Sequence, residues 1–305
     1  MNRATTQPLS SAQRRSIGLI TFAALAVYLA MRFLPVGSNL NHMDFRVEEK
    51  GAIEFCDPLN PQFIPVVAVK SPVSLKLESD EAPAQNKPAR FTLTMSTASG
   101  KPIGPADLLV AHTRKLHLLV IDPTLNDYQH IHPEPGRRAG EWEFGMEPSR
   151  TGTYLVFADF TPAATGRGLY ASADFTVPGP VPRVTRETNW TYSSGPYRFE
   201  LAPLLDLRAG LPNQLKLSVT RVDGKPVPLS PVMGAFAHLV AFDEARSGFA
   251  HLHPDQTDLT APPDAVKPEL TFKITIPRAG RYVVWSQMIV EGREVFVPFW
   301  VDVLP

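Results

Sequence analysis

The chain has 305 residues, and its 30 Lys and Arg residues balance 30 Asp and Glu residues, so the formal net charge is zero. A neutral chain lacks the positive excess that binds nucleic acid or another polyanion, so we exclude that class of partner. The length suits two domains of ordinary size. The 31 prolines disfavour long helices and suit turns and edge strands.

The first predicted element is a transmembrane anchor over residues 16–36, SIGLITFAALAVYLAMRFLPV. Crossing a bilayer takes about 20 apolar residues, which this segment supplies. Three arginines precede it, namely Arg3, Arg14 and Arg15. No acidic residue occurs before Asp44, so the positive-inside rule places residues 1–15 in the cytoplasm as an N-terminal tail. We therefore expect a single-pass protein of a bacterial inner membrane with its C-terminal domains in the periplasm.

The residues after the anchor are predicted to form a juxtamembrane linker, 37–68. Val36–Ser38 also resembles a cleavage site, so a cleaved signal peptide is the alternative to an anchor. The apolar stretch is longer than a usual signal core, which favours the anchor. The linker contains the only cysteine, Cys56, which excludes an intramolecular disulfide. We expect Cys56 to act as a small buried apolar residue.

The rest of the chain contains an internal repeat. FTLTMSTASGKPI (Phe91–Ile103) matches LKLSVTRVDGKPV (Leu215–Val227) at a shift of 124 residues, and YQHIHP (Tyr128–Pro133) matches FAHLHP (Phe249–Pro254) at 121. Three further blocks match in the same order, and the shift changes only between blocks, where loops absorb insertions. We infer a duplication of one domain.

Each half is predicted to be a β-sandwich. Phe91, Leu93 and Met95 alternate with threonine and serine, which is typical of a half-buried strand. SGKP and DGKP are turn signals, and each half contains about seven strand-like runs, as immunoglobulin-like domains do. The predicted fold class is all-β, with two tandem immunoglobulin-like β-sandwiches after the N-terminal helix. They cover residues 69–178 and 193–305, joined by a stiff proline-rich linker, 179–192.

Each half repeats the pattern H-x12-H-x-H-P. The matched histidines are His117, His130 and His132 in the first half and His238, His251 and His253 in the second. Residues two apart in a strand share a face, and neighbouring strands lie about 4.8 Å apart. Three imidazoles of one half can therefore converge on one metal ion.

A further matched pair lies five residues before the first histidine of each pattern, His112 in one half and Met233 in the other. Imidazole and thioether ligands together suit copper, especially Cu(I), outside the cytoplasm. An offset of five places the two residues on opposite faces of a regular strand, so a bulge or bend is needed to bring them together. The candidate metal ligands are His112, His117, His130 and His132, and Met233, His238, His251 and His253.

A structural role is the alternative for these histidines, and it requires no cofactor. A histidine before a proline at a sheet edge often caps backbone groups, and His117 and His238 can be buried residues bonded to carbonyls. The metal hypothesis requires both residues to point at their H-x-H pairs rather than into hydrogen bonds with the backbone.

Two other matched pairs receive structural interpretations. Asp122 and Asp243 each end a strand before a loop and are interpreted as turn formers. Tyr154 and Tyr282 follow TG and AG and are interpreted as the corner tyrosines of sandwich folds.

Signatures of enzymes are missing from the sequence. It contains no G-x-S-x-G, no phosphate-binding or dinucleotide-binding glycine pattern and no H-E-x-x-H. Asp159 matches Gln287 across the repeat, so a carboxylate role shared by both halves fails there. We predict that the protein is not an enzyme.

The segment VAHTRKLHLLVIDPTLNDYQHIHPEP, followed by GTYLVFADFTP, and its counterpart in the second half resemble a known family. It comprises secreted or membrane-anchored bacterial proteins with tandem immunoglobulin-like, YtkA-like sandwich domains, often labelled heavy-metal- or copper-associated. The resemblance covers most of each half and does not include the anchor. It implies an extracytoplasmic sandwich and a copper role for the histidine sets named above.

The leading functional prediction is a non-catalytic structural or binding subunit of a larger bacterial membrane complex. By likeness of architecture, the complex is of the respiratory or photosynthetic type. The helix 16–36 would contact the bilayer and neighbouring membrane subunits, and the tandem sandwich would present a rigid surface to them. The alternative is a periplasmic copper-binding or copper-delivery protein that uses the histidine and methionine sets.

Overall fold

A computed structural model describes residues 10–33, 38, 40–45 and 61–305. Cys56, Arg3 and most of the predicted linker lie outside the described residues. The chain divides into two compact units, Met1–Asn39 and Leu40–Pro305.

The helix α1 (Ser11–Phe33) forms the first unit. Ser10 and Gln13 cap its start reciprocally, since each backbone N–H bonds to the other side chain, at 2.9 and 3.2 Å. The span Ser11–Met31 is long and apolar enough to cross a membrane, a property that signal sequences share.

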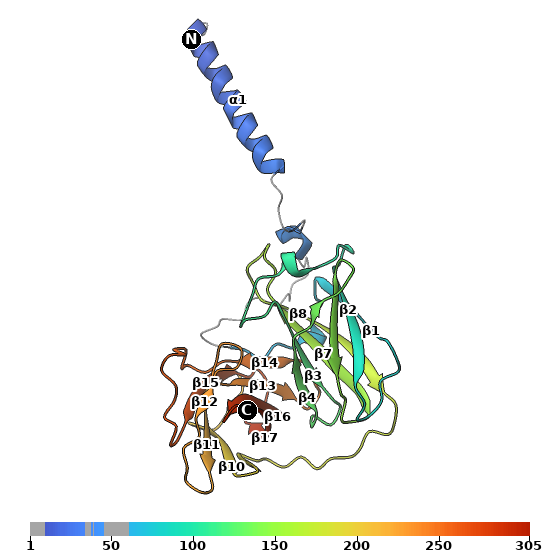
Figure 1. The fold of residues 1–305 in the computed structure, drawn as a ribbon, viewed down its shortest axis with the longest axis vertical. Helices are drawn as coiled ribbons and strands as arrows, with labels where there is room; N and C mark the ends of the chain where they lie inside the picture. Colours follow the sequence, from blue (N-terminus) through green and yellow to red (C-terminus); the bar gives the residue numbers. More distant parts are fainter. Residues whose placement is uncertain (1–9, 34–37, 39, 46–60) are drawn as a thin grey trace. The chain divides into compact units, whose positions relative to one another are not determined.

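The first sandwich consists of two four-stranded antiparallel sheets (Figure 1). The first sheet has the order β1 (Val73–Ser79), β2 (Ala89–Thr97), β6 (Glu141–Met146), β5 (Glu134–Pro135). The second has the order β4 (Tyr128–Ile131), β3 (Leu116–Ile121), β7 (Gly152–Phe160), β8 (Leu169–Val177).

The second sandwich repeats this plan. Its first sheet has the order β15 (Glu269–Thr275), β11 (Pro212–Arg221), β10 (Tyr197–Pro203), β9 (Thr191–Ser194). Its second sheet has the order β12 (Leu229–Ser230), β16 (Gly280–Val290), β13 (His238–Asp243), β14 (Phe249–Leu252), and β17 (Arg293–Val303) pairs with β16. Short 3-10 turns occur at η1 (His42–Phe45), η2 (Val66–Ala68) and η3 (Pro105–Asp107). The predicted all-β fold with two tandem sandwiches is confirmed.

Alternation of apolar residues builds each core. In β2, Phe91, Leu93 and Met95 are buried in the first sandwich, as the pattern predicts. The corner tyrosines are confirmed: the Tyr154 hydroxyl accepts the backbone N–H of Arg150 at 2.9 Å, and the Tyr282 hydroxyl donates to the carbonyl of Arg278 at 3.0 Å, so each bonds to the backbone four residues before it. Each pin ties the end of a central strand to the loop before it.

The aspartates predicted to form turns also do so. Asp122 accepts the backbone N–H groups of Thr124 and Asn126, both at 2.8 Å, and Asp243 accepts that of Ser247 at 2.6 Å. These bonds shape the loops that lead into β4 and β14.

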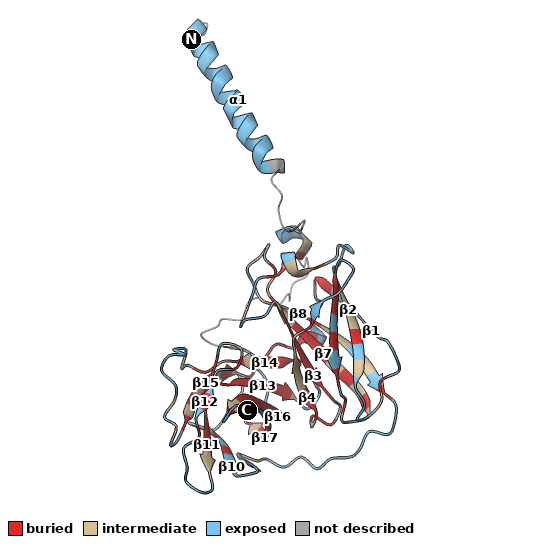
Figure 2. Ribbon diagram, viewed as in Figure 1, coloured by how far each residue is buried: buried red, intermediate tan, exposed pale blue. Residues whose placement is uncertain are grey.

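The two sandwiches pack face to face through their second sheets. Strand β3 is buried along both faces: Leu116, Leu118 and Val120 enter the first core, whereas Leu119 and Ile121 enter a separate apolar layer. That layer continues into the second sandwich and includes Val240, Phe242, Val283 and Trp285. Figure 2 shows the buried character of these central strands. We call this layer the interdomain core.

Two chain segments reinforce the packing. Ile64, at the end of the predicted linker, exchanges backbone hydrogen bonds with Phe249 at 2.7 and 3.1 Å, so this part is bound to the second sandwich rather than loose. In the segment between the sandwiches, Thr151 donates to the carbonyl of Pro180, and Arg281 donates to that of Arg186.

Candidate metal centre

Seven of the eight histidines gather at one end of the interdomain core. They include two groups, which we call the first triad (His117, His130 and His132) and the second triad (His238, His251 and His253). Within each triad, one nitrogen from every ring lies within 4.8 Å of the other two. The structure thus brings together each predicted H-x12-H-x-H set.

Strand register explains the convergence. In the β3–β4 pair, Leu119 lies opposite His130, so the antiparallel register sets His132 across from His117. In the β13–β14 pair, Val240 lies opposite His251, so the same register sets His253 across from His238. Because side chains alternate between faces, the histidines continue the face that forms the interdomain core.

A hairpin turn resolves the problem of the five-residue offset. Ala111 and Arg114 exchange backbone hydrogen bonds at 2.8 and 3.0 Å around His112 and Thr113, which both have positive φ, 48° and 70°. This is the two-residue turn of tight β-hairpins. The second half repeats it, with Met233 at φ 49° in the place of His112.

The central histidine of each triad hydrogen-bonds to the backbone and also points at its H-x-H pair. His117 donates from Nε2 to the carbonyl of Ala111 at 2.9 Å, and His238 donates from Nε2 to the carbonyl of Val232 at 2.9 Å. The other ring nitrogen, Nδ1, faces the H-x-H pair. The backbone bond therefore orients the ring toward its triad, as the partners of metal-bound histidines do.

The first histidine of each H-x-H pair is held from the other sandwich. His130 Nδ1 lies 2.8 Å from Oε1 of Gln287, and His251 Nδ1 lies 3.2 Å from Oδ2 of Asp159. We call Gln287 and Asp159 the backing residues. The Gln287 amide nitrogen donates to Glu294 at 2.6 Å, which turns its oxygen toward His130.

The backing residues do not stand out in the sequence, because Asp159 and Gln287 match in position but not in charge, which argues against a shared carboxylate role. The signal lay in the register: Asp159 is the cross-strand neighbour of His117, and Gln287 is that of His238. Each residue sits beside one triad and holds a histidine of the other.

The remaining nitrogens converge within each triad. In the first triad, Nδ1 of His117 lies 3.1 Å from Nε2 of His130 and 3.2 Å from Nε2 of His132. In the second, Nδ1 of His238 lies 3.1 Å from Nε2 of His251, and Nε2 of His253 is buried with no hydrogen-bond partner. Ligands about 2.0 Å from a tetrahedral ion are about 3.3 Å apart, so these spacings fit a metal.

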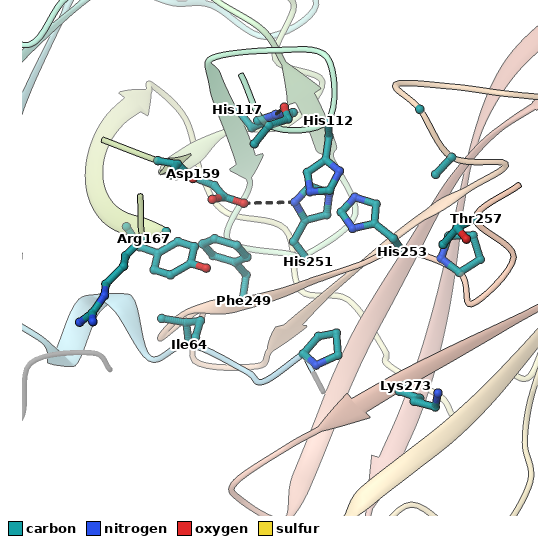
Figure 3. Close-up of a pocket in the computed structure, with 18 of the residues that line it drawn as sticks. Ile64, His112, His117, Asp159, Arg167, Phe249, His251, His253, Thr257 and Lys273 are labelled. Carbon is teal, nitrogen blue, oxygen red and sulfur yellow. Dashed lines mark hydrogen bonds and ion pairs between the residues drawn. The ribbon is translucent and has the colours of Figure 1, made fainter. Parts of the chain in front are cut away.

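The two triads are neighbours across the interface. The ring centroids of His130 and His251 lie 5.3 Å apart, and those of His117 and His251 lie 5.9 Å apart. His112 was predicted to join the first triad, but its ring stacks on His253 of the second at 3.7 Å and lies 6.2 Å from His117 (Figure 3). Met233 is half-buried at the tip of the matching turn, and its place in a ligand set stays a prediction.

Burial keeps the imidazoles neutral. Desolvation lowers the pKa of His132 and of His238 to about 4 and lowers the pKa of His130 and of His251 well below its ordinary value, and neighbouring histidines add to each decrease. Burial also raises the pKa of Asp159, and electrostatic interactions with His117 and His112 oppose this increase. Neutral imidazole is the form that binds metals.

A cavity of about 790 Å³ leads to the histidines. Its wall includes His112, His117, Asp159, His251 and His253, and Figure 3 shows these side chains beside the hollow. The cavity gives an ion or a small metal chelate a path to His117 of the first triad and to His251 and His253 of the second. Each triad can hold a metal ion.

Both sandwiches match one known domain family, and the match assigns no role to the histidines. Residues 68–179 and 191–304 both match a domain family described as a domain of unknown function, DUF8832. No curated protein gives a significant match.

Two solved structures show only a loose likeness. Red sea bream transglutaminase shares 11% identity at a TM-score of 0.25, and the alignment covers 78% of this chain and 32% of that one. The native conformation of E. coli alpha-2-macroglobulin shares 13% identity at a TM-score of 0.25, covering 76% and 17%. The chain thus spans under a third of either protein, and neither likeness carries a functional argument. The two family matches lie in tandem over most of the chain, which therefore belongs to the DUF8832 family.

Proposed function

We propose that this protein binds copper outside the cytoplasm, with one ion in each histidine triad. The observation that carries the proposal is that nitrogens of buried imidazoles lie 3.1 Å apart in each triad, in positions where the other hydrogen bonds of the rings leave lone pairs facing each other. The hydrogen bonds behind each ring supply this argument, because a neutral imidazole carries one proton only.

In the first triad, a backbone carbonyl cannot donate, so Nε2 of His117 must carry the proton and Nδ1 is left as a lone pair. The Gln287 oxygen likewise accepts the proton of His130 Nδ1, which leaves Nε2 bare. These two bare nitrogens lie 3.1 Å apart. Two acceptors at this distance repel each other unless a cation lies between them.

The second triad supports the same conclusion. The carbonyl of Val232 fixes the proton of His238 on Nε2, and the proton of His251 is on Nδ1 when the Asp159 carboxylate is the acceptor of their hydrogen bond. The bare nitrogens of His238 and His251 then face each other at 3.1 Å. The buried Nε2 of His253 lacks a partner beside them, which a metal would supply.

A metal ion suits these positions better than a proton, because burial lowers the pKa of every histidine in the triads. Copper leads the divalent metals in affinity for nitrogen ligands, and Cu(I) adds only one positive charge to a buried neutral site. The resemblance to sandwich domains labelled copper-associated agrees with this choice of metal.

The N-terminal helix supports a location at the membrane. We propose that α1 anchors the chain, with Arg14 and Arg15 on the cytoplasmic side and the sandwiches in the periplasm. Copper would be bound there without catalysis, as a carrier or store.

Metal analysis of the full chain in detergent tests the proposal. Metal-free protein is dialysed against Cu(II), or anaerobically against Cu(I), and bound copper is counted. We expect two ions per wild-type chain and one for either His130→Ala/His132→Ala or His251→Ala/His253→Ala. His42→Ala, outside the triads, is the matched control and retains two. Wild-type protein that binds no copper at micromolar concentration, or that binds only zinc, contradicts the proposal.

A second candidate function is the predicted accessory subunit of a membrane complex. Exposed leucines favour it: Leu204 and Leu205, in the loop between β10 and β11, are 60% and 84% exposed, and Leu211 in the same loop is 53% exposed. Such an apolar loop suits a protein partner. Native mass measurement after mild detergent extraction tests it, and a monomer with no copurifying subunit argues against it.

A further inference from the structure

The two triads match in all their ligands and differ in what surrounds them. A carboxylate, Asp159, backs the second triad, whereas a neutral amide, Gln287, backs the first. We propose that this difference makes the second triad a Cu(II) site and the first triad a Cu(I) site. The inference rests on the proposed copper function and adds the oxidation state that each site selects.

The backing contacts are built into the fold. Asp159 lies on β7 opposite His117, and Gln287 lies on β16 opposite His238, so the duplication places both at one position. Each reaches across the interface to the first histidine of the other half's H-x-H pair. Changing one backing residue therefore alters the site in the opposite sandwich and leaves that site's own strands intact.

Charge balance gives the two sites different preferences. The first triad with Cu(I) has a net charge of plus one, since its ligands and Gln287 are neutral. A divalent ion bound to His251 favours the ionised form of Asp159, and the second triad with Cu(II) then has the same net charge. Burying a second uncompensated positive charge is unfavourable, so the first triad resists Cu(II). A carboxylate hydrogen-bonded to His251 also makes that imidazole a stronger donor to a divalent ion.

A second difference acts in the same direction. Arg114 ends the hairpin turn beside the first triad, and its match in the second half is Ala235. The Arg114 charge acts on His117 and on His132 of that triad. Arg114 is exposed and lies 3.8 Å from the Glu134 carboxylate, so its charge disfavours a divalent ion in the first triad only weakly, and Ala235 has no such effect on the second.

Two carboxylates approach the first triad, and neither hydrogen-bonds to one of its ligands. Asp159 lies opposite His117 and acts on that ring through its charge, whereas its hydrogen bond goes to His251 of the second triad. Glu294 acts through Gln287. Glu294 accepts the amide N–H of Gln287 at 2.6 Å, and the Gln287 oxygen then accepts the proton of His130. Glu294 is exposed to solvent, so its charge is screened. Its main effect is to fix the orientation of the amide, and through it the tautomer of His130.

The experiment compares the affinities of single sites in the full chain in detergent. His130→Ala/His132→Ala leaves the second triad, and His251→Ala/His253→Ala leaves the first. Cu(I) affinity is measured anaerobically by competition with a chromophoric chelator, and Cu(II) affinity by competition together with electron paramagnetic resonance. We expect the preference for Cu(II) over Cu(I) to be about 10–100-fold greater in the second triad.

Reciprocal variants of the backing residues decide the cause. Asp159→Gln should lower the Cu(II) affinity of the second triad about 10–100-fold with little change for Cu(I), and Gln287→Asp should raise the Cu(II) affinity of the first. The second variant is a gain, so misfolding cannot imitate it. Equal preferences in the two single-site proteins, or swaps that leave both preferences unchanged, overturn the inference. Absence of copper from both sites instead overturns the proposed function.

Discussion

The first and second triads compare two outcomes of one duplication. The H-x-H pair, the central histidine and the backbone carbonyl that orients it occur in both halves, with matching distances of 2.9 and 3.1 Å. The backing residues and the turn tips differ. The parts that would touch the metal are thus retained, whereas the groups that set its electrostatic environment have diverged.

The interface between the halves completes both triads. Because each backing residue comes from the opposite sandwich, neither half contains a complete site. Packing of the second sheets in the interdomain core brings each backing residue to the H-x-H pair of the opposite half. Breaking the interface should therefore weaken metal binding in both triads. Changes within one half should alter the metal affinity of the two triads unequally.

The largest expected change in stability comes from a substitution in the interdomain core. Phe157 is fully buried there and matches Trp285 across the repeat. Phe157→Ala should lower the free energy of unfolding by about 3–5 kcal/mol, because it removes a buried ring and leaves a cavity. Urea unfolding of the metal-free protein measures this. Val222→Ala is the control, since Val222 is 79% exposed, and it should be close to neutral. A loss for Phe157→Ala as small as that of the control contradicts a packed interface.

A smaller effect on stability tests the segment around Ile64, whose backbone hydrogen-bonds to Phe249 of the second half. A Cβ atom on Gly248 would lie 1.7 Å from the carbonyl oxygen of Ile64, so the docked segment must shift. Gly248→Ala should cost about 1–3 kcal/mol, as overpacking does. Gly145 has only one neighbour, at 3.7 Å, and Gly145→Ala should be close to neutral. Thermal unfolding of both variants checks this, and equal melting temperatures count against the docking.

The pH dependence tests the burial of the histidines. The pKa of His238 falls to about 4 in the folded protein, mainly through burial, whereas an unfolded histidine has a pKa of about 6.5. The unfolded state therefore binds the extra proton, and stability is lost as the pH falls from 6.5 toward 4. Each such histidine contributes about 1.4 kcal/mol per pH unit within that window.

Unfolding of the metal-free protein at pH 7, 6, 5 and 4.5 measures this slope. His238→Gln removes one titrating group and should make the slope shallower, although the variant starts from a lower stability. A stability that is independent of pH between 6.5 and 4.5 is inconsistent with neutral buried triads.

The smallest expected change in stability distinguishes the two hairpin turns. Thr113 has φ 70° in the first turn, where the second turn has Gly234 at φ 79°. Thr113→Gly should stabilise the protein by about 1 kcal/mol and Gly234→Thr should destabilise it by a similar amount, because side chains disfavour this conformation. Paired chemical denaturation curves show the difference, and a shift of the same sign in both variants refutes the matched geometry.

Much of the fold could be predicted from the sequence. Alternating residues such as Phe91, Leu93 and Met95 predict strands, and the ordered blocks predict two copies of one sandwich. The spacing of His117, His130 and His132 also predicts their convergence, because strand geometry fixes which neighbours share a face.

The contacts between the halves could not be predicted in this way. His130 and Gln287 are 157 residues apart, and His251 and Asp159 are 92 apart. A pattern of period two shows that a face is buried but not which surface covers it. His112 was assigned to the first triad for that reason, although it stacks on His253. Asp159 was set aside because its match is neutral, yet that difference separates the two sites.

Anomalous diffraction at the copper edge, from crystals of the copper-loaded full chain, tests the copper sites most directly. We expect two peaks, one in each triad, each with three imidazole nitrogens at about 2.0 Å. The bound nitrogens should be Nδ1 of His117 and His238 and Nε2 of the H-x-H histidines. Copper peaks elsewhere on the surface, with both triads lacking metal, would contradict the assignment.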